Sequence, residues 1–336
     1  MTLTQLNAFV LVARLGSVRA AASVLGVSEP AVSQAITALR HYLGDQLITR
    51  GANGMTLTPG GARLLSTASQ IVVLGAEAQA AVRAAQGAPE QLRVVAAPTF
   101  AEFVAAPLME AFTRRFAGPV EVSTGVVASG EQAVLVANRL ADVGFGPHAS
   151  GLRLQASGPE GSGAQVGGDL SNAASMPVVS EPIFKYRMAA VAAGHAKLRG
   201  PARSWKWLVG PSGADPGSAT SRLLARLGVP DSNIGVLPSQ TAAWAAAADG
   251  GGVAPAIEHL VSQQLRRGEL SLVDVPGLPV EECWYATLLE RDHRSTAAGA
   301  LRRFLGTPEA MHLMRSPAAG VPPSRFKPPV YVTIWS

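Results

Sequence analysis

Five side chains recur at helical spacing between residues 30 and 41, and their types suit contact with DNA. A glutamine amide can make two hydrogen bonds to an adenine edge, and serine and threonine hydroxyls can bond base edges or phosphates. On an isolated helix, an ordinary solvated face would be the simpler interpretation. The choice therefore depends on the elements that position this segment. The five positions are Pro30, Ser33, Gln34, Thr37 and His41.

Three short amphipathic patterns follow one another in the first 43 residues, and each predicts one helix with a single apolar stripe. The breaks between them are Gly16-Ser17 and Gly26-Val27-Ser28, where each serine can cap the next helix. Two helices joined by a short glycine-containing turn form the unit that places its second helix in a major groove. The three stripes are Leu6, Phe9, Val10 and Ala13, then Val18, Ala21, Ala22 and Leu25, then Val32, Ala35, Ile36, Leu39 and Leu43.

Two strand-like runs come next, at residues 47–50 and 55–58, with an Asn-Gly turn signal between them. They predict a β-hairpin wing beside the helices. Arg50 would then reach a phosphate or a minor groove, the alternative being an ordinary surface arginine.

In these features, residues 1–61 resemble the N-terminal domain of LysR-type transcriptional regulators. The resemblance implies a DNA-binding domain over residues 1–58, and Ser28, Arg40 and Arg50 join the five positions above as its expected DNA contacts. Arg40 and Ile48 depart from the family pattern, which usually has glutamate and phenylalanine there; Arg40 is expected to favour phosphate contact. The matching residues are Leu6, Phe9, Gly16, Ser17, Ala21, Ala22, Leu25, Ser28, Pro30, Ala31, Val32, Ser33, Ile36, Leu39, Leu43, Gly44, Leu47, Arg50, Leu57, Thr58 and Gly61.

A long helix is predicted over residues 59–87, with Thr58 as its cap and Pro59 in its first turn. At 1.5 Å per residue it would be about 40 Å long. Its small-residue seam predicts close approach of a partner helix, and the resemblance implies an antiparallel helix pair in a homodimer or homotetramer. Residues 87–89, Gly-Ala-Pro, are a candidate hinge. The seam is Leu64, Ala68, Ile71, Gly75, Ala78, Val82 and Ala85.

Alternating strands and helices predict a two-lobed α/β domain over residues 92–306. Expected strands of the first half lie at 92–97, 120–124 and 141–145, with helices at 99–116 and 131–139. The second half is expected to begin with a strand at 186–193 and to place helices at 218–227, 241–248, 256–267 and 296–305 and strands near 208, 234, 253, 270–275 and 283–289. This part resembles the periplasmic-binding-protein-like effector domain of the family, through residues 92–95, 141–144 and 194–198.

A small-molecule effector is expected at turns after strands, where helix N-termini also favour anions. Simple helix capping is the alternative at each of these turns. Trp244 is expected in the core rather than at the ligand. The expected effector-binding residues are Pro98, Thr99, Ser129, Gly144, Phe145, Ser239 and Thr241, with Gly146 and Pro147 completing the run at the crossover.

Two further segments fall outside this pattern. Residues 150–175 are glycine-rich and predict a flexible loop between the halves, as an idle insertion or as a lid. Residues 307–336 predict a proline-rich tail that ends in a strand, Val330 to Trp335, which we expect to dock on a sheet edge.

Composition and motifs limit the classes of protein to which this chain can belong. The net charge of +5 over 336 residues is compatible with nucleic acid. Neither a signal peptide nor a run of about eighteen uncharged apolar residues is seen, so no membrane association is expected. The single cysteine, Cys283, lies in an apolar pattern, which predicts a core position and suits a reducing cytoplasm. The six histidines are scattered and no catalytic motif occurs, so no enzyme activity, cofactor or metal is expected.

The sequence therefore predicts a multidomain α plus α/β protein with an N-terminal winged helix-turn-helix, a long linker helix and a two-lobed effector domain. Its expected partners are double-stranded DNA, a small-molecule effector and further copies of itself, with RNA polymerase as an additional candidate. Two alternatives stay open. One is a small-molecule-binding protein with a vestigial DNA module, and the other is a protein that binds DNA without sequence preference. Salt dependence together with a specificity ratio separates them.

Overall fold

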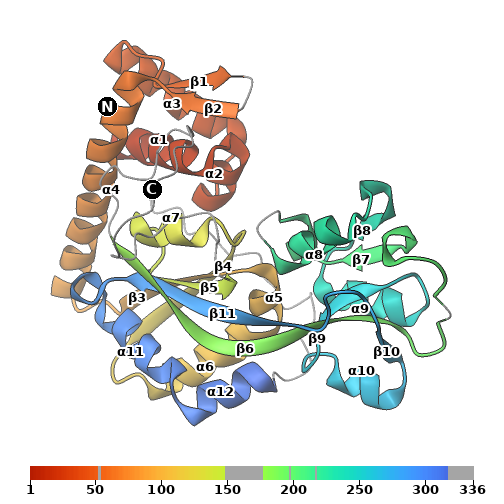
Figure 1. Cartoon of the computed structure of the whole chain (residues 1–336). Coiled ribbons are helices and arrows are strands. Elements are labelled where there is room, and N and C mark those ends of the chain that lie inside the picture. The colour runs from red at the N-terminus through yellow and green to blue at the C-terminus, as the bar shows by residue number, and fades with distance from the viewer. Residues whose placement is uncertain (52–53, 148–176, 197, 216–217, 317–336) are drawn as a thin grey trace, which may run out of the picture.

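The computed structural model describes residues 1–51, 54–147, 177–196, 198–215 and 218–316. Three helices and a two-stranded hairpin form its N-terminal domain, and α4 runs from there along one side of the effector domain (Figure 1). The predicted winged helix-turn-helix is confirmed. Its elements are α1 (Leu3–Leu15), α2 (Val18–Leu25), α3 (Glu29–Leu43), β1 (Ile48–Gly51) and β2 (Gly54–Leu57).

Local hydrogen bonds explain where these helices begin and end. The hydroxyls of Ser17 and Ser28 accept from the backbone N–H of Ala20 and Ala31, as expected of N-caps. Gly16 and Gly26 end the preceding helices in the left-handed conformation, with φ of 65° at each. The turns between the helices are therefore determined by serine and glycine residues that can be recognised in the sequence.

The linker helix α4 (Pro59–Ala85) begins as predicted, since the Thr58 hydroxyl accepts from Gly61 N–H at 2.9 Å. The predicted seam concerns a partner helix of another subunit and stays a prediction; the packing that the structure describes is that within one chain. The buried stripe comprises Gly61, Leu65, Ala68, Ser69, Val72 and Val73. Gly75 does allow a close approach, but to α1, because a Cβ there would lie 2.7 Å from Leu3 Cδ2. Ala78, Val82 and Ala85 are exposed.

The effector domain has two lobes joined by two long strands, β6 (Val178–Ala193) and β11 (Val280–Leu289), which cross both lobes in Figure 1. Lobe 1 contains β3 (Glu90–Ala96), α5 (Pro98–Phe100), a π-helix η1 (Ala101–Ala105), α6 (Ala106–Arg115), β4 (Val120–Val126), α7 (Gln132–Ala137), β5 (Val143–Pro147), α11 (Thr296–Leu305) and α12 (Pro308–Arg315). Lobe 2 contains β7 (Trp207–Val209), α8 (Ala219–Leu227), β8 (Ile234–Val236), α9 (Gln240–Ala248), β9 (Ala254–Ile257), α10 (Ser262–Arg267) and β10 (Leu270–Val273).

The sheet topology is more mixed than the predicted parallel βαβ units. A seven-stranded sheet has the order β10-β6-β11-β5-β3-β4, with β9 also paired to β6. Among its described strands, only β3 pairs in parallel, with β4 and with β5, whereas β11 runs antiparallel to both β5 and β6. A separate parallel pair, β7 and β8, completes lobe 2. The return strands β6 and β11 thus hold the lobes on one continuous sheet.

Several predicted elements need correction. Residues 256 and 257 belong to strand β9, and the helix predicted over 256–267 is shortened to α10. The helix predicted over 99–116 is interrupted by the π-helical turn η1. The strand predicted at 186–193 begins earlier, at Val178. Cys283 is half-buried rather than in the core.

The effector domain also extends past its predicted end at residue 306. Helix α12 packs against α6, and Ala310 and Met314 are buried in the lobe 1 core. Its start carries the Thr-Pro signal already seen at α4: Thr307 caps it and Pro308 opens it. The predicted glycine-rich loop at 150–175 and the predicted C-terminal strand lie outside the described residues.

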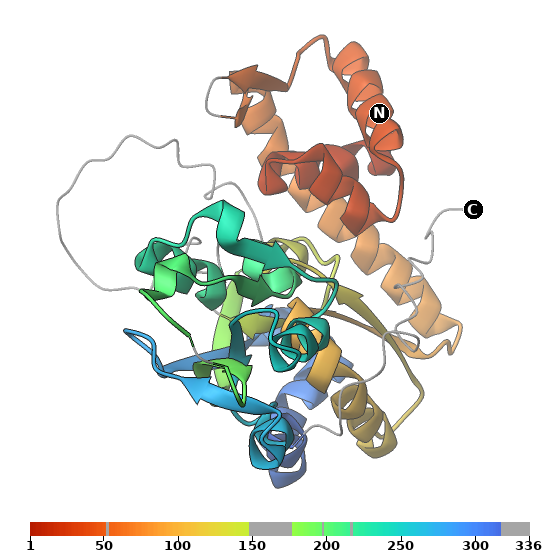
Figure 2. The ribbon, with the colours of Figure 1, turned by 90° about the vertical axis from the view of Figure 1, so that its right-hand side faces the viewer.

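The view in Figure 2 shows the N-terminal domain above the two lobes, with α4 descending from it along one side of the effector domain. One buried apolar cluster crosses this junction. It includes Leu6 and Leu65 from the N-terminal part together with Leu135, Val136 and Leu289 from lobe 1 and β11. Within the described part of the chain, no helix has both the length and the apolar character needed to cross a membrane.

Candidate DNA-binding face and effector cavity

Helix α3 has one face in the core and one face open to solvent. Val32, Ile36 and Leu39 are buried against α1 and α2. The five sequence-predicted positions Pro30, Ser33, Gln34, Thr37 and His41 are all exposed. The opposite faces follow from the helical period, so a helix that must bury the first set has to present the second.

Two of the predicted contacts also stabilise the helix itself. The Ser28 hydroxyl caps α3, and the Thr37 hydroxyl donates to the Ser33 carbonyl oxygen at 2.9 Å. Gln34, at the centre of the exposed face, is the side chain best suited to read a base edge.

Arg40, for which a phosphate contact is expected, also contacts the wing. It is half-buried, and its guanidinium donates to the carbonyl oxygens of Gln46 and Ile48, both at 2.7 Å. These bonds join the end of α3 to the first strand of the hairpin. Arg40 therefore helps to fix the position of the wing, and its expected phosphate contact stays a prediction.

The wing is an antiparallel hairpin whose register pairs Arg50 with Met55 and Gly51 with Gly54. The side chain of Arg50 lies outside the described part, so its expected phosphate contact stays a prediction. Asp45 anchors the hairpin base, since its carboxylate accepts from Leu47 N–H at 2.6 Å and from the Thr58 hydroxyl at 2.7 Å. These two bonds lower the pKa of Asp45.

A cavity of about 60 Å³ lies between the lobes. Its walls come from the ends of the lobe 1 elements, from the loops before α8 and α9, and from β6, β9 and β11. The lining residues are Ala97, Thr99, Phe100, Ser129, Pro147, Tyr186, Met188, Ser212, Ser218, Ala219, Thr220, Gln240, Trp244, Pro255, Ala256, Ile257 and Trp284.

Two of the seven sequence-predicted effector residues, Thr99 and Ser129, line this cavity, and the other five do not. Pro147, at the end of the run expected at the crossover, also lines it. Phe145 is fully buried and stacks on Phe100 with ring centroids 4.7 Å apart. Gly144 lies under Gln132, whose Cβ would be 2.9 Å from a Cβ at that glycine.

The remaining three predicted residues have structural roles beside the cavity. Ser239 is the N-cap of α9 and accepts from Ala242 N–H at 3.0 Å. Thr241 bonds Glu102 of lobe 1, and Pro98 opens the short helix α5. Trp244 is in the core, as expected, but also forms part of the cavity wall.

Sequence reasoning missed the aromatic floor of the cavity. Tyr186 on β6 and Trp284 on β11 lie with ring centroids 5.0 Å apart, and Phe100 meets Trp284 edge-on at 5.2 Å. The sequence of both strands is typical of core strands. No local feature of the sequence distinguishes an aromatic side chain in a core from one in a cavity wall.

Three polar contacts cross from lobe 1 to lobe 2 around the cavity. Glu102 accepts from Gln240 N–H and Thr241 N–H, both at 2.9 Å, and from the Thr241 hydroxyl. Ser129 N–H donates to Asp215 Oδ2 at 3.0 Å. The hydroxyls of Thr99 and Ser212 are 3.2 Å apart. The lobes are therefore held together by the protein's own groups.

Burial changes the acidity of two groups at this site. The pKa of Glu131, next to the Ser129 turn, is raised chiefly by burial, and a backbone bond from Ala128 and the nearby charge of Asp215 act in opposite directions. Burial also raises the pKa of the Tyr186 hydroxyl, which is protonated at neutral pH even at its usual value.

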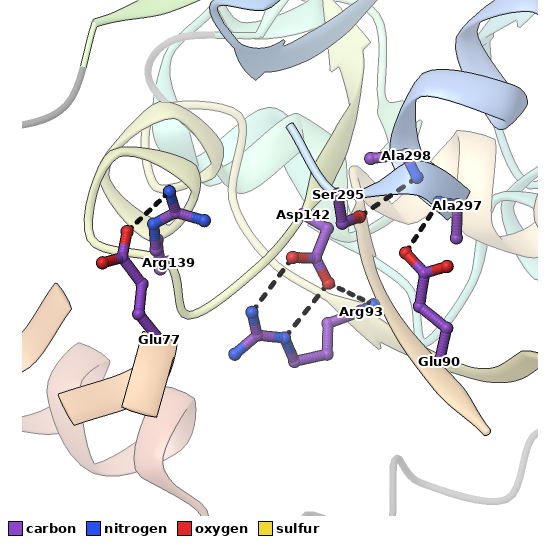
Figure 3. A network of polar contacts seen from close by, with 8 residues as sticks. All are labelled: Glu77, Glu90, Arg93, Arg139, Asp142, Ser295, Ala297 and Ala298. Atoms are coloured by element: carbon purple, nitrogen blue, oxygen red, sulfur yellow. Dashed lines mark hydrogen bonds and ion pairs between the residues drawn. The ribbon is translucent and has the colours of Figure 1, made fainter. Parts of the chain in front are cut away.

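Polar contacts also join the linker helix to lobe 1 (Figure 3). Glu77 of α4 pairs with Arg139, which follows α7, at 2.8 Å. In the same region Arg93 and Asp142 form a bidentate pair between β3 and β5, at 3.0 and 3.1 Å. Glu90 accepts from Ala297 N–H at 2.8 Å and so fixes the start of α11. The ion pair of Glu77 thus links α4 to lobe 1, and the other two contacts hold β3 to its neighbours within that lobe.

Metal chemistry finds no support in the part of the chain that the structure describes, where His, Cys, Asp and Glu side chains form no group of three that could hold an ion.

Known protein families match both the N-terminal domain and the effector domain of the chain. Residues 3–62 match the model of the bacterial regulatory helix-turn-helix protein, LysR family, and residues 166–307 match the LysR substrate binding domain. An HTH-type transcriptional regulator of Mycobacterium tuberculosis strain H37Rv is 34% identical over 344 residues, and the alignment covers 100% of both chains. The HTH-type transcriptional regulator CfxR of Cupriavidus necator is 27% identical, with 91% of each chain covered.

Among solved structures, a full-length variant of AphB has the same fold. The TM-score is 0.52 at 16% sequence identity, and the match covers 91% of this chain and 98% of that one.

Proposed function

The chain belongs to the LysR family of bacterial transcriptional regulators, and from this premise we propose that α3 reads base edges while the cavity between the lobes binds the effector. The observation that carries the proposal is the exposed face of α3. Ser33, Gln34, Thr37 and His41 lie outward on a helix whose other face is locked into the domain core. A side chain held on a rigid element can position its donors for one base sequence.

The proposed division of labour assigns roles to individual residues. Gln34 is the base reader, while Ser33 and His41 contact bases or phosphates. Thr37 contributes its methyl group and the hydroxyl oxygen that its bond to Ser33 leaves accessible. Arg50 holds the backbone from the wing, and Pro30 and Ser28 set the angle at which α3 enters the groove.

We further propose that the regulator acts as a homodimer or homotetramer in the cytoplasm. The exposed apolar side chains of α4 support this, since Leu74 and Val82 are 62% and 57% exposed within one chain. Two copies of the N-terminal domain would read two half-sites. RNA polymerase is a proposed partner, because a regulator bound beside a promoter acts by contacting that enzyme or by excluding it.

The test is footprinting of the full chain on the DNA upstream of its own gene, at two salt concentrations, with random DNA as competitor. A protected site of roughly two-fold symmetry that survives competition supports the proposal. Uniform protection that vanishes with salt would instead identify a protein that binds DNA without sequence preference. The absence of binding to this and other genomic fragments would favour a small-molecule-binding protein with a vestigial DNA module.

A further inference from the structure

The wall of the cavity between the lobes carries no charged side chain among the described residues. It combines aromatic rings, notably Tyr186, Trp244 and Trp284, with hydroxyl groups and the amide of Gln240. An anion buried in such a wall needs compensating donors or a positive charge, because an unpaired charge in a low-dielectric site is strongly unfavourable. The backbone N–H groups beside the cavity are the obvious candidates for this compensation.

Carboxylates of the protein itself already occupy four of those N–H groups. Glu102 takes the first two N–H groups of α9, at Gln240 and Thr241, which is the position where a helix dipole favours an anion. Asp215 takes Ser129 N–H, and Glu131 takes Ala128 N–H at 3.0 Å. Three acidic side chains therefore stand directly behind the wall, where a ligand carboxylate would otherwise find its donors.

Two hydroxyls of the wall, in contrast, belong to neutral side chains that line the cavity itself. Tyr186 and Ser129 are 8% and 4% exposed. Buried polar groups are rarely unsatisfied in folded proteins, and such groups in a cavity are commonly completed by a ligand or water. The Tyr186 hydroxyl is protonated at neutral pH, as in any tyrosine with an ordinary or raised pKa, and can donate to a ligand.

We propose that the effector is a small uncharged molecule with a flat apolar body and a hydrogen-bonding carbonyl, amide or hydroxyl group, and that its carboxylate analogues are rejected. This inference rests on the proposed function in one respect, namely that the cavity is the effector site. The Tyr186 hydroxyl donates to the ligand's oxygen, and the rings of Trp244 and Trp284 pack against its apolar part. A carboxylate at the same place would lie near the like charges of Glu102 and Asp215, and no cationic side chain among the described residues lines the cavity to offset them.

The first experiment compares matched pairs that differ only in charge. Benzamide and benzoate form one pair, and acetamide and acetate form a smaller pair suited to a cavity of about 60 Å³. Each is titrated into the full chain at neutral pH by ligand-detected NMR and by the fluorescence of the wall tryptophans. We expect saturable binding of at least one amide, at least about tenfold tighter than that of its carboxylate partner, because a tenfold ratio needs only about 1.4 kcal/mol of repulsion.

Two variants identify the groups responsible. Tyr186→Phe should weaken amide binding about tenfold, as expected when a buried hydrogen bond to the ligand is lost; Tyr42→Phe, on the exposed surface of α3, is its matched control. Glu102→Gln should strengthen benzoate binding about tenfold, because it removes a negative charge from the α9 N-terminus. Glu110→Gln, exposed on α6, is the control for that change.

The outcomes separate this inference from the proposed function. A carboxylate that binds the unmodified chain as tightly as its amide overturns the ligand class, as does the absence of saturable binding by both amides. Either result leaves the DNA footprint intact, so the regulator itself is not in question. Loss of the footprint would refute the proposed function whatever the cavity binds.

Discussion

On α3 the side chains proposed to contact DNA are exposed, whereas the polar groups around the effector cavity are mostly buried and bonded to one another. Gln34 lies on an open face, and nothing in the described fold depends on its amide. Glu102 and Asp215, by contrast, bond backbone groups of the opposite lobe. The DNA-contacting face is thus preformed in the free protein. The cavity, in contrast, is closed by contacts between the lobes that a bound ligand has to accommodate or replace.

This difference affects what a substitution can reveal. On α3, a change at an exposed position should alter binding and leave the free energy of unfolding nearly unchanged. Around the cavity, the same side chains support the fold and the ligand, so a change there should alter both. The four predictions below test that contrast, from the largest expected effect to the smallest.

Trp284→Ala should give the largest effect, a loss of about 3–5 kcal/mol in the free energy of unfolding. The indole is 2% exposed and meets the rings of Phe100, Phe184 and Tyr186 with centroids 5.0 to 5.7 Å away. Urea unfolding followed by circular dichroism measures the loss. Trp205→Ala, at a half-buried position of lobe 2, should cost clearly less. Equal losses would show that the aromatic floor is not the centre of this core.

Gln34→Ala should leave stability unchanged but reduce the ratio of specific to nonspecific DNA affinity by about 1–3 kcal/mol, the range for one bidentate base contact. The ratio is measured by competition footprinting. Gln70→Ala, exposed on α4, is the matched control. Arg50→Ala should weaken binding to all DNA sequences alike, because phosphate contacts carry no sequence information. If Gln34→Ala keeps the full ratio, α3 does not read bases through this residue.

The same contrast decides how much could be predicted from the sequence. The DNA-binding domain depends on local signals: Ser17 and Ser28 cap the helices that follow them, and Gly16 and Gly26 end the helices that precede them. Each of these signals acts on its near neighbours in the chain, so the sequence displays it directly. The exposed face of α3 then follows from the helical period alone.

The cavity depends instead on contacts between distant residues. Tyr186 and Trp284 meet only because β6 and β11 pair in a particular antiparallel register, and Glu102 reaches α9 from a position 138 residues earlier in the chain. The sequence showed the turns at Thr99 and Ser129, since they follow strands. It could not show that Glu102 would occupy the α9 N-terminus, where Ser239 and Thr241 were expected to meet an effector.

Acidification should destabilise the effector domain and the N-terminal domain in different pH ranges. Burial lowers the pKa of His259 below its usual 6.5, with an opposing bond to Met314 and a further lowering from Arg315. Between that lowered value and about 6.5 the unfolded chain binds a proton that the folded chain does not. The contribution of His259 to stability is therefore complete above pH 6.5 and is lost as the pH falls, by at most about 1.4 kcal/mol per pH unit.

The contribution of Asp45 to the stability of the N-terminal domain should be lost only at a lower pH than that of His259. Hydrogen bonds from Leu47 N–H and the Thr58 hydroxyl lower the pKa of Asp45 below 3.8, so its contribution to stability is present above that value and is lost as the pH falls further.

The contribution of His259 is measured by comparing the unfolding of the wild-type chain with that of His259→Gln from pH 7 to pH 5. The difference between the two chains should change over this range. A constant difference would show that His259 titrates as it does in the unfolded chain.

Glu77→Gln should give the smallest effect, about 0.2–1 kcal/mol, because its ion pair with Arg139 is partly open to solvent. The pair joins α4 to lobe 1 at 2.8 Å, and the side chains are 43% and 19% exposed. Glu121→Gln is the control, since its pair with Arg83 also joins α4 to lobe 1 but is longer, at 3.5 Å, and more exposed. Hydrogen exchange of the last turns of α4 should increase more in Glu77→Gln than in Glu121→Gln.

This pair also tests whether the two regions work independently. The apolar cluster shared by α1, α4 and lobe 1 should keep them in contact when one partly exposed ion pair is removed, so the DNA specificity ratio and the affinity of the cavity should both stay at their wild-type values. A change in either value caused by Glu77→Gln, and not by Glu121→Gln, would mean that the junction transmits strain from one region to the other. The open face of α3 and the closed cavity would then be two ends of one coupled element, and substitutions at either end would have to be interpreted together.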